Sequence, residues 1–338
     1  MHLPDNYLSP QTCGFMFALS TPIVVTSVNK IKLELKNNSL MAPMLGISSS
    51  LSFLIMMFNI PIPGGTTAHA VGGTLLAILV GPYAACISLS VSLILQAFLF
   101  GDGGILSLGA NIFNIACIMP FSGYYIYNIF RKKQHRELGT IIGSYVGINL
   151  SALLVSLELG IQPIIFHDSS GVPLYNPYSI EITLPAMMIA HLFIAGVIES
   201  FFTYTIYKFI YRVSPDSIYY DKKDKVNIRY NLKYLYRIIF MLVIISPIGL
   251  ISKDTAFGEW SGKELLNRLI NENIMSSLPM GIKNGLSYNS IFTDYVIPGV
   301  SDSISYILSA LTAVLLFIIG SKVLGAIYGK SKNSNLPS

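Results

Sequence analysis

Apolar runs recur along the whole chain, and they limit its fold more than any other feature. A helix needs about 20 apolar residues to cross roughly 30 Å of hydrocarbon, and within the bilayer only helices and closed barrels satisfy every backbone group. Nine runs qualify, over residues 10–28, 40–59, 67–81, 82–100, 105–130, 138–159, 182–211, 234–251 and 304–328. With only 12% charged residues, the chain could not coat globular domains. We therefore expect an all-α, polytopic membrane protein of about nine transmembrane helices, embedded in the lipid bilayer.

The distribution of positive charge predicts the orientation of these helices. Short cytoplasmic loops are enriched in Lys and Arg. If the N-terminus is outside, all but four of the 22 Lys and Arg residues fall on one side of the membrane. The four exceptions share one long loop: Lys253, Lys263, Arg268 and Lys283. We therefore expect the N-terminus outside and the C-terminus inside. The residues before Pro10 include no Lys or Arg, which argues against a cleaved signal peptide.

A basic stretch divides the chain into two modules. Residues 1–212 hold seven of the runs and form the expected core module. Residues 213–233 form a basic cytoplasmic linker, and residues 234–338 form an appendage of two helices joined by an external loop. The halves do not resemble inverted copies of each other, which weakens the case for a conventional secondary transporter.

Several classes of function are disfavoured by the remaining composition. The excess of basic residues sits in short clusters between apolar runs, so nucleic acid is not an expected partner. The three cysteines, Cys13, Cys86 and Cys117, lie inside apolar runs and form no CxxC pair, which points to neither a disulfide framework nor a zinc site. No phosphate-binding loop is present, and no cofactor is indicated.

The first two residues offer an unusual set of metal donors. The α-amine of Met1, the amide nitrogen of His2 and His2 Nδ1 lie in one chelating run. Because the amide must lose its proton to bind, the set favours nickel(II) or copper(II), with cobalt(II) also compatible. The alternative is that a histidine at this position is an accident of the sequence.

A fourth ligand is expected to be an outward-facing histidine near a helix end, and His69 fits. It follows a turn rich in Pro and Gly over residues 61–65, and Thr66 or Thr67 is suited to cap the next helix. We expect His69 in or near the first turn of that helix, on the same side as His2. The alternative to metal binding is that His69 only forms a hydrogen bond with a neighbouring residue, and the sequence leaves both roles open.

Polar residues next to these candidates suggest supporting roles. Asp102 lies in the external turn 101–104, which contains three glycines, and Asn111 follows within the membrane. Asp102 is suited either to cap a helix or to accept a hydrogen bond from a metal-bound imidazole. Polar residues at the depth of Asn111 usually have a function.

Three more ionisable residues lie within the apolar runs: Glu158, His191 and Glu199. His191 and Glu199 are eight positions apart and therefore differ by about 80° around a helix. They either form hydrogen bonds inside the bundle or contribute to an intramembrane metalloenzyme, although no HExxH motif is present. On the second run, the small residues Ala42, Gly46 and Ser50 recur every fourth position, which lets another helix approach closely. The alternative is that they serve packing inside the same bundle, and both possibilities stay open.

Taken together, these residues resemble the CbiM/NikM family, the substrate-capture membrane component of energy-coupling factor (ECF) transporters for cobalt and nickel. The resemblance covers about residues 1–212, at positions 1–5, 8–10, 61–69, 72–73, 81–82, 96–104 and 109–111, with His191 and Glu199. The remainder resembles the long form of the family, which carries a fused two-helix accessory component. One departure is Asn6, where the family usually has glycine. Because Asn tolerates the left-handed conformation, we expect the turn to survive.

The resemblance implies a function and a set of roles. Met1, His2 and His69 would hold one Ni²⁺ or Co²⁺ ion in a square-planar nitrogen site, with Asp102, Asn111, Glu158 and His191 as candidates for the surrounding shell. Ala42, Gly46 and Ser50 would contact a transmembrane coupling subunit, which works with a cytoplasmic ATPase pair. The chain would then be a non-enzymatic component of metal uptake in the plasma membrane of a bacterium or archaeon, with cobalamin biosynthesis as one use of the cobalt. The rivals are a permease that works alone and the metalloenzyme.

Overall fold

The computed structural model describes residues 1–63, 66–219, 232–252 and 254–329, and its long elements are all helices. The core module contains α1 (Pro10–Asn37), α2 (Met41–Met56), α3 (Gly73–Val80), α4 (Pro82–Leu95), α5 (Leu108–Asn111), α6 (Met119–Lys132), α7 (Arg136–Gly160), α8 (Gln162–Ile165), α9 (Ile180–Ala190) and α10 (Gly196–Val213). The second module contains α11 (Leu232–Ile245), α12 (Gly262–Asn271), α13 (Met280–Lys283) and α14 (Asp302–Gly329). Short 3-10 helices, η4 (Pro215–Ser217), η6 (Ser246–Ile251) and η7 (Thr293–Tyr295), complete the helical elements.

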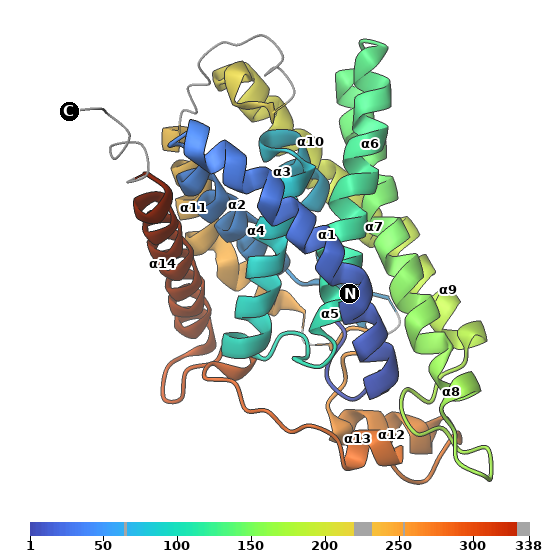
Figure 1. Ribbon diagram of the computed structural model, residues 1–338. Helices are drawn as coiled ribbons and strands as arrows, with labels where there is room; N and C mark the ends of the chain where they lie inside the picture. Colours follow the sequence, from blue (N-terminus) through green and yellow to red (C-terminus); the bar gives the residue numbers. More distant parts are fainter. Residues whose placement is uncertain (64–65, 220–231, 253, 330–338) are drawn as a thin grey trace.

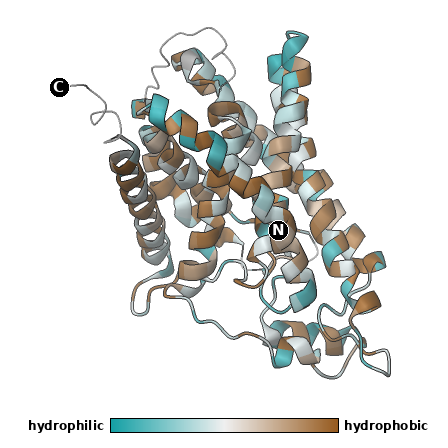
Figure 2. Ribbon diagram, viewed as in Figure 1, coloured by the Kyte–Doolittle hydropathy of each residue, from teal (hydrophilic) through white to brown (hydrophobic). Residues whose placement is uncertain are grey.

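The membrane character expected from the sequence is confirmed. Six helical stretches of the described residues are long and apolar enough to span a bilayer: Pro10–Asn37, Pro82–Phe100, Arg136–Ile165, Ile180–Val213, Leu232–Ile251 and Asp302–Tyr328. Helix α2 is apolar but shorter. Hydrophobic residues cover the middle of the long helices, and hydrophilic ones gather toward several of their ends (Figure 2). The count of nine helices and the orientation remain predictions, and most of the expected linker lies outside the described residues.

Residues 67–72 do not form the start of a helix, which corrects the expected span over 67–81. Strands β1 (Ile60–Ile62) and β2 (Thr66–Ala68) form a small antiparallel hairpin in which Ile60 pairs with Ala68. Helix α3 begins only at Gly73, because Gly72 adopts a left-handed conformation with φ of 77°. A sharp turn at Gly81 separates the runs over 67–81 and 82–100, since α3 ends at Val80 and α4 begins at Pro82.

Three helices contain a π-helical segment: η1 (Gln96–Phe100) at the end of α4, η2 (Ile112–Ile118) between α5 and α6, and η3 (His191–Ala195) between α9 and α10. Segments of this kind occur often at functional sites. Here η1 leads directly into the turn that holds Asp102, η2 follows Asn111, and η3 begins at His191. Each therefore adjoins a residue that the sequence had marked for the metal site.

The second module lies against the core module along one side, with α11 and α14, and at one end, with α12 and α13 (Figure 1). Helix α14 packs lengthwise on α2, while α12 and α13 cover the end of the molecule where α1 begins. The N-terminus lies among the helices and not at an outer edge (Figure 1). The turn between α6 and α7 and the end of α10 lie at the opposite end from α12 and α13.

Candidate metal centre

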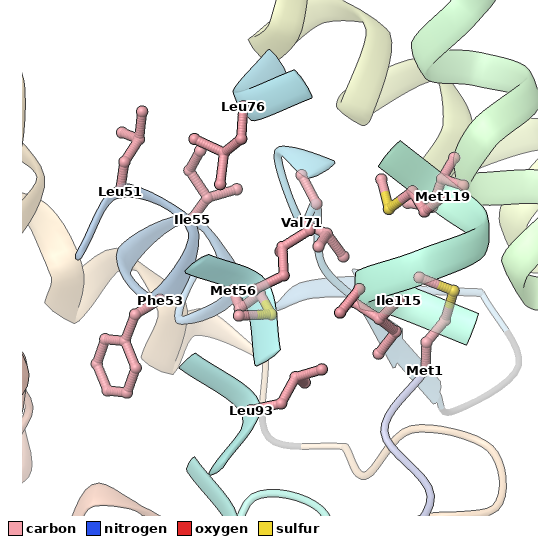
Figure 3. Close-up of a cluster of buried hydrophobic side chains, with 14 of the residues drawn as sticks. Met1, Leu51, Phe53, Ile55, Met56, Val71, Leu76, Leu93, Ile115 and Met119 are labelled. Carbon is pink, nitrogen blue, oxygen red and sulfur yellow. The ribbon is translucent and has the colours of Figure 1, made fainter. Parts of the chain in front are cut away.

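The first three residues are buried inside the core module. Helix α1 begins at Pro10 because Ser9 caps it, accepting a hydrogen bond from the backbone amide of Thr12. Before this cap, the chain turns back and inserts its end among the helices, so that Met1 is only 6% exposed and His2 only 2%. The side chain of Met1 lies in an apolar cluster with Ile115 (Figure 3). The burial of an N-terminus whose amine carries a charge is costly unless that amine has a partner or a ligand.

Backbone contacts fix the position of this segment. Asn111 accepts a hydrogen bond from the Leu3 amide at 2.8 Å and donates one to the Leu3 carbonyl at 3.0 Å. The same carbonyl accepts from the Gly104 amide at 2.9 Å and from the Ser107 hydroxyl. Asn111 therefore holds the chain immediately beyond His2.

The turn that follows is held in the same way. Asp5 accepts from the amides of Ile105 and Leu106 at 3.1 and 2.7 Å. Asn6 adopts the left-handed conformation, with φ of 69°, as the sequence predicted. Its side chain forms two hydrogen bonds with the backbone of Leu286, in the long loop between α11 and α14. The left-handed turn thus forms with asparagine at this position, and the asparagine side chain makes contacts that glycine cannot make.

The structure brings His2 and His69 together, although they are 67 positions apart. Their ring centroids are 5.1 Å apart, and both side chains are buried. His69 donates from Nδ1 to the Ala70 carbonyl at 3.0 Å, which leaves Nε2 as its available ligand atom. Burial lowers the pKa of His69 to about 3, and the charge of the Met1 α-amine and the His2 ring add to this effect. The imidazole is therefore neutral at physiological pH, the form that binds metals.

Asp102 contacts His2 directly. Its Oδ1 accepts a hydrogen bond from His2 Nδ1 at 2.6 Å, while Oδ2 accepts from Gln96 at 3.1 Å and from the Tyr295 hydroxyl at 2.5 Å. Burial by itself would raise the pKa of Asp102, but the charge and hydrogen bond of His2 and the Tyr295 hydroxyl hold it well below its usual range. The carboxylate is therefore ionised where it meets the imidazole.

Two residues of the second module reach this centre, and sequence reasoning gave them no role. Glu259 forms an ion pair with the Met1 α-amine at 2.9 Å. Tyr295 stacks on Phe100 with ring centroids 4.9 Å apart and places its hydroxyl on Asp102. Tyr295 and the preceding Asp294 both have positive φ, a strained conformation for residues other than glycine. Sequence patterns gave no signal for these contacts, because they join residues 258 positions apart (Met1 and Glu259) and 193 positions apart (Asp102 and Tyr295).

The imidazoles open into a cavity of about 320 Å³ between the modules. His2, His69 and Asp102 line it from the core module, and Glu259 and Asp294 line it from the second module. Within the described residues, no three His, Cys, Asp or Glu side chains converge as a metal cluster. A metal at this place would therefore need the terminal and backbone nitrogens as well as the two imidazoles.

The other candidates of the surrounding shell have partners of their own. His191 donates from Nδ1 to the Met187 carbonyl at 2.7 Å. Glu158 accepts from the Asn114 side chain at 2.9 Å. Neither residue has a described hydrogen bond to His2 or His69, so the structure does not bring them into the centre as direct contacts.

Glu199 has a role that the sequence did not suggest. Its buried carboxylate accepts hydrogen bonds from the amides of Val71 at 2.7 Å and Gly72 at 3.0 Å. These amides precede helix α3 and follow His69 by only two and three positions. Glu199 therefore fixes the irregular segment that carries His69, and it explains how that segment remains non-helical with its buried amides paired.

The stripe of small residues on α2 does not face outward. A Cβ atom added at Gly46 would lie 2.7 Å from Ser321 Cβ and 2.8 Å from the Phe317 carbonyl oxygen, both on α14. Ala42 and Ser50 are also buried. This corrects the expectation that the stripe is open to a coupling subunit, because the second module of the same chain covers it. The small residues do allow a helix to approach α2 closely, but that helix is α14 of the same chain.

Comparison with known proteins places this geometry in context. A sequence model described as the cobalt uptake substrate-specific transmembrane region, CbiM, matches residues 2–217. The probable fused nickel transport protein LarMN of Lactiplantibacillus plantarum is 50% identical over 94% of this chain and 96% of its own length. The fused nickel transport protein NikMN of Rhodobacter capsulatus is 36% identical over 95% of this chain and 96% of its own.

Two solved structures are also similar. A truncated transition metal transporter is 49% identical, with a TM-score of 0.60, and the match covers 63% of this chain and 99% of that one. A second transition metal transporter is 46% identical, with a TM-score of 0.59, and the match covers 70% and 99%. Both the sequence of the whole chain and the fold of its larger part therefore have relatives described as metal transport proteins.

Proposed function

Because the chain belongs to the CbiM family of cobalt uptake substrate-specific transmembrane proteins, we propose that it captures Ni²⁺ or Co²⁺ from the external side of the plasma membrane. The ligands are the Met1 α-amine, the amide nitrogen and Nδ1 of His2, and the imidazole of His69. The observation that carries this proposal is the burial of the chain's first residues with the His2 and His69 rings 5.1 Å apart. Such a run of nitrogen donors suits metals with tetragonal geometry.

Metal binding in this scheme requires His2 to exchange partners. In the structure its Nδ1 donates a hydrogen bond to Asp102 at 2.6 Å. Among the described residues, nothing forms a hydrogen bond with its buried Nε2. We infer that the ring turns so that Nδ1 enters the chelate and Nε2 faces Asp102. The carboxylate then orients the metal-bound imidazole, as carboxylates commonly do around metal-ligating histidines.

The second module also reaches this site. Glu259 forms an ion pair with the buried Met1 α-amine at 2.9 Å, and this contact must be released or rearranged for the amine to become a ligand. The fused form of the protein therefore carries, in one chain, both the metal ligands and an acidic group that pairs with the terminal amine.

Uptake driven by ATP is the further part of the proposal. The chain would act as the substrate-specific component of an ECF-type transporter, with a transmembrane coupling subunit and cytoplasmic ATPase subunits as partners. The support is the resemblance to the CbiM/NikM family and the fused transport relatives. The coupling subunit would bind elsewhere than the α2 stripe, which α14 occupies. Uptake in cells that lack the ATPase partner would instead favour the permease that works alone.

The arrangement disfavours the intramembrane metalloenzyme. His191, Glu158 and Glu199 bind three different partners, namely the Met187 carbonyl, the Asn114 side chain and the amides at 71–72. Among the described residues these three side chains have no hydrogen bond with one another. They act as structural groups of the bundle and do not form one reactive centre.

The decisive experiment measures Ni²⁺ and Co²⁺ binding by the purified full chain, with absorption spectra as a second readout. We compare the native terminus, a chain with one additional residue before Met1, His2→Ala and, as a matched control, His167→Ala in an exposed external loop. The extension leaves every side chain in place but moves the free amine. We expect the extension and His2→Ala to abolish binding and the square-planar spectrum, while His167→Ala binds normally. Normal binding by the extended chain would refute terminal chelation.

A further inference from the structure

Two hollows lie one after the other between helices α7 and α10, at the end of the molecule opposite α12 and α13. The first has a volume of about 540 Å³ and is lined by residues 134–138 together with Tyr207, Lys208 and Tyr211. The second has a volume of about 440 Å³ and lies deeper along the same two helices, between Ile141 and Tyr145 on one side and Val197 and Phe201 on the other. Neither takes part in the metal centre.

The first hollow is basic. Arg136 lies over the Tyr211 ring at 5.8 Å and donates to its hydroxyl at 3.4 Å. Lys208 is 3.4 Å from Glu137, whose carboxylate also accepts from the Tyr204 hydroxyl. A guanidinium has five N–H donors and an ammonium has three, so both cations can bind an anion while they keep these contacts. Exposed Lys132, Lys133 and Arg212 add positive charge nearby.

The second hollow is apolar. Phe201 is 67% exposed and Val197 is 54% exposed, and both line it. The polar groups along its walls have partners of their own: the Tyr145 hydroxyl donates to the Leu192 carbonyl at 2.9 Å, the Ser200 hydroxyl to the Gly196 carbonyl at 2.8 Å, and the Tyr204 hydroxyl to Glu137 at 2.9 Å. The groove therefore presents hydrocarbon to its occupant.

We propose that this pair of hollows binds one anionic phospholipid, with its headgroup phosphate between Arg136 and Lys208 and an acyl chain in the groove beside Phe201. The phosphodiester is the anion that Arg and Lys at a membrane surface bind most readily, and the tyrosines belong to the interfacial layer where such rings gather. Charge at one end and hydrocarbon along the helices match a lipid molecule. A partner helix would place apolar side chains in both hollows, which does not suit the first one, where the single carboxylate of Glu137 faces the two cations Arg136 and Lys208. The proposal requires only that the chain spans the membrane, and it does not depend on the metal site.

The test uses the full chain, purified in a mild detergent and given equal amounts of phosphatidylglycerol and phosphatidylcholine, with native mass spectrometry to count the retained lipids. We compare the wild-type chain, Arg136→Gln, Lys208→Gln and the double variant. Lys322→Gln is the matched control, because it removes an exposed charge from α14, outside both hollows. Each relevant charge should lower the preference for phosphatidylglycerol about fivefold, from roughly 1 kcal/mol per basic residue near an anionic surface. The control should leave it unchanged.

Two additional measurements distinguish a bound lipid from other occupants of the hollows. Val197→Trp fills the groove and should reduce lipid retention while both cations remain. Glycerol 3-phosphate, which has the anion but no acyl chain, should not displace the lipid at millimolar concentration. Displacement by it would show a simple phosphate site and overturn the proposal. The proposal is also wrong if the double variant, still folded by circular dichroism, keeps the wild-type preference, or if Val197→Trp leaves lipid retention unchanged but prevents assembly with a protein partner.

Discussion

Asn111 provides the sharpest test of how the metal centre is built. Its side chain holds both the amide and the carbonyl of Leu3, and it is only 2% exposed. Asn111→Ala leaves the buried Leu3 amide without its acceptor, at about 1–3 kcal/mol, and also removes the hydrogen bond to the Leu3 carbonyl, at about 1 kcal/mol. The Leu3 carbonyl retains Gly104 and Ser107. The inserted conformation of the N-terminal segment should therefore lose about 2–4 kcal/mol.

This loss should appear as weaker metal binding with unchanged ligands. Only the inserted conformation places His2 beside His69, so the apparent Kd rises as the inserted fraction falls. At 1.4 kcal/mol per factor of ten, this loss can raise the Kd by at most about 30- to 700-fold. The rise is smaller where a larger free-energy margin favours insertion in the wild-type chain. Isothermal titration with Ni²⁺ gives the Kd, and the absorption spectrum at saturation should match the wild type.

The matched control is Asn114→Ala, a buried Asn three positions further along that binds Glu158 and not the N-terminal segment. Hydrogen exchange at Leu3 should accelerate in Asn111→Ala and remain slow in the control. A folded Asn111→Ala chain with wild-type affinity and slow exchange at Leu3 would refute the reasoning.

Other perturbations test the contacts between the modules. Tyr295→Phe keeps the aromatic stack but removes the hydrogen bond to the Asp102 carboxylate. We expect the unfolding free energy, measured by thermal unfolding, to fall by about 1.5–3 kcal/mol. Tyr306→Phe, in the neighbouring ring, should have a smaller effect. Gly46→Ala should destabilise the chain by about 1–3 kcal/mol through overpacking, whereas Gly320→Ala, whose added Cβ meets nothing within 4 Å, should be neutral or slightly stabilising in the same denaturation assay. Asn6→Gly keeps the left-handed turn but loses both hydrogen bonds to Leu286 in the loop between α11 and α14. Hydrogen exchange at the Leu286 amide should therefore accelerate. Unchanged exchange would show that those bonds do not hold the loop.

The sequence identified the parts of the metal centre better than it identified their surroundings. His2, His69, Asp102 and Asn111 were all recognised as candidates, and the structure gathers them around the start of the chain. Their chemical types carry the information, because few side chains bind metals or pair buried amides. Glu259 and Tyr295 were missed as contacts because an acidic residue and a tyrosine in a long loop are ordinary in sequence, and only their positions in space make them part of the site.

The irregular segment before α3 shows a similar limit. Threonines, an apolar run and a suitable length favoured a helix over 67–81. The structure instead forms a hairpin and an irregular stretch, because the Glu199 carboxylate pairs with the amides of Val71 and Gly72. A buried acceptor 127 or more positions away outweighed the local preference, and it left His69 outside any helix.

What the sequence determined by itself is local or additive: the membrane-spanning character, the turn at Gly81 and the left-handed conformation at Asn6. Hydropathy sums over a segment, and turns depend on a few neighbouring residues. What only the tertiary structure decided are contacts between residues far apart in the sequence. These are the insertion of the N-terminus, the packing of α14 on the small residues of α2, and the contacts of Glu259 with Met1 and of Tyr295 with Asp102. These depend on which groups meet once the helices pack, because a carboxylate, an amide or a small residue suits many partners and burial selects one.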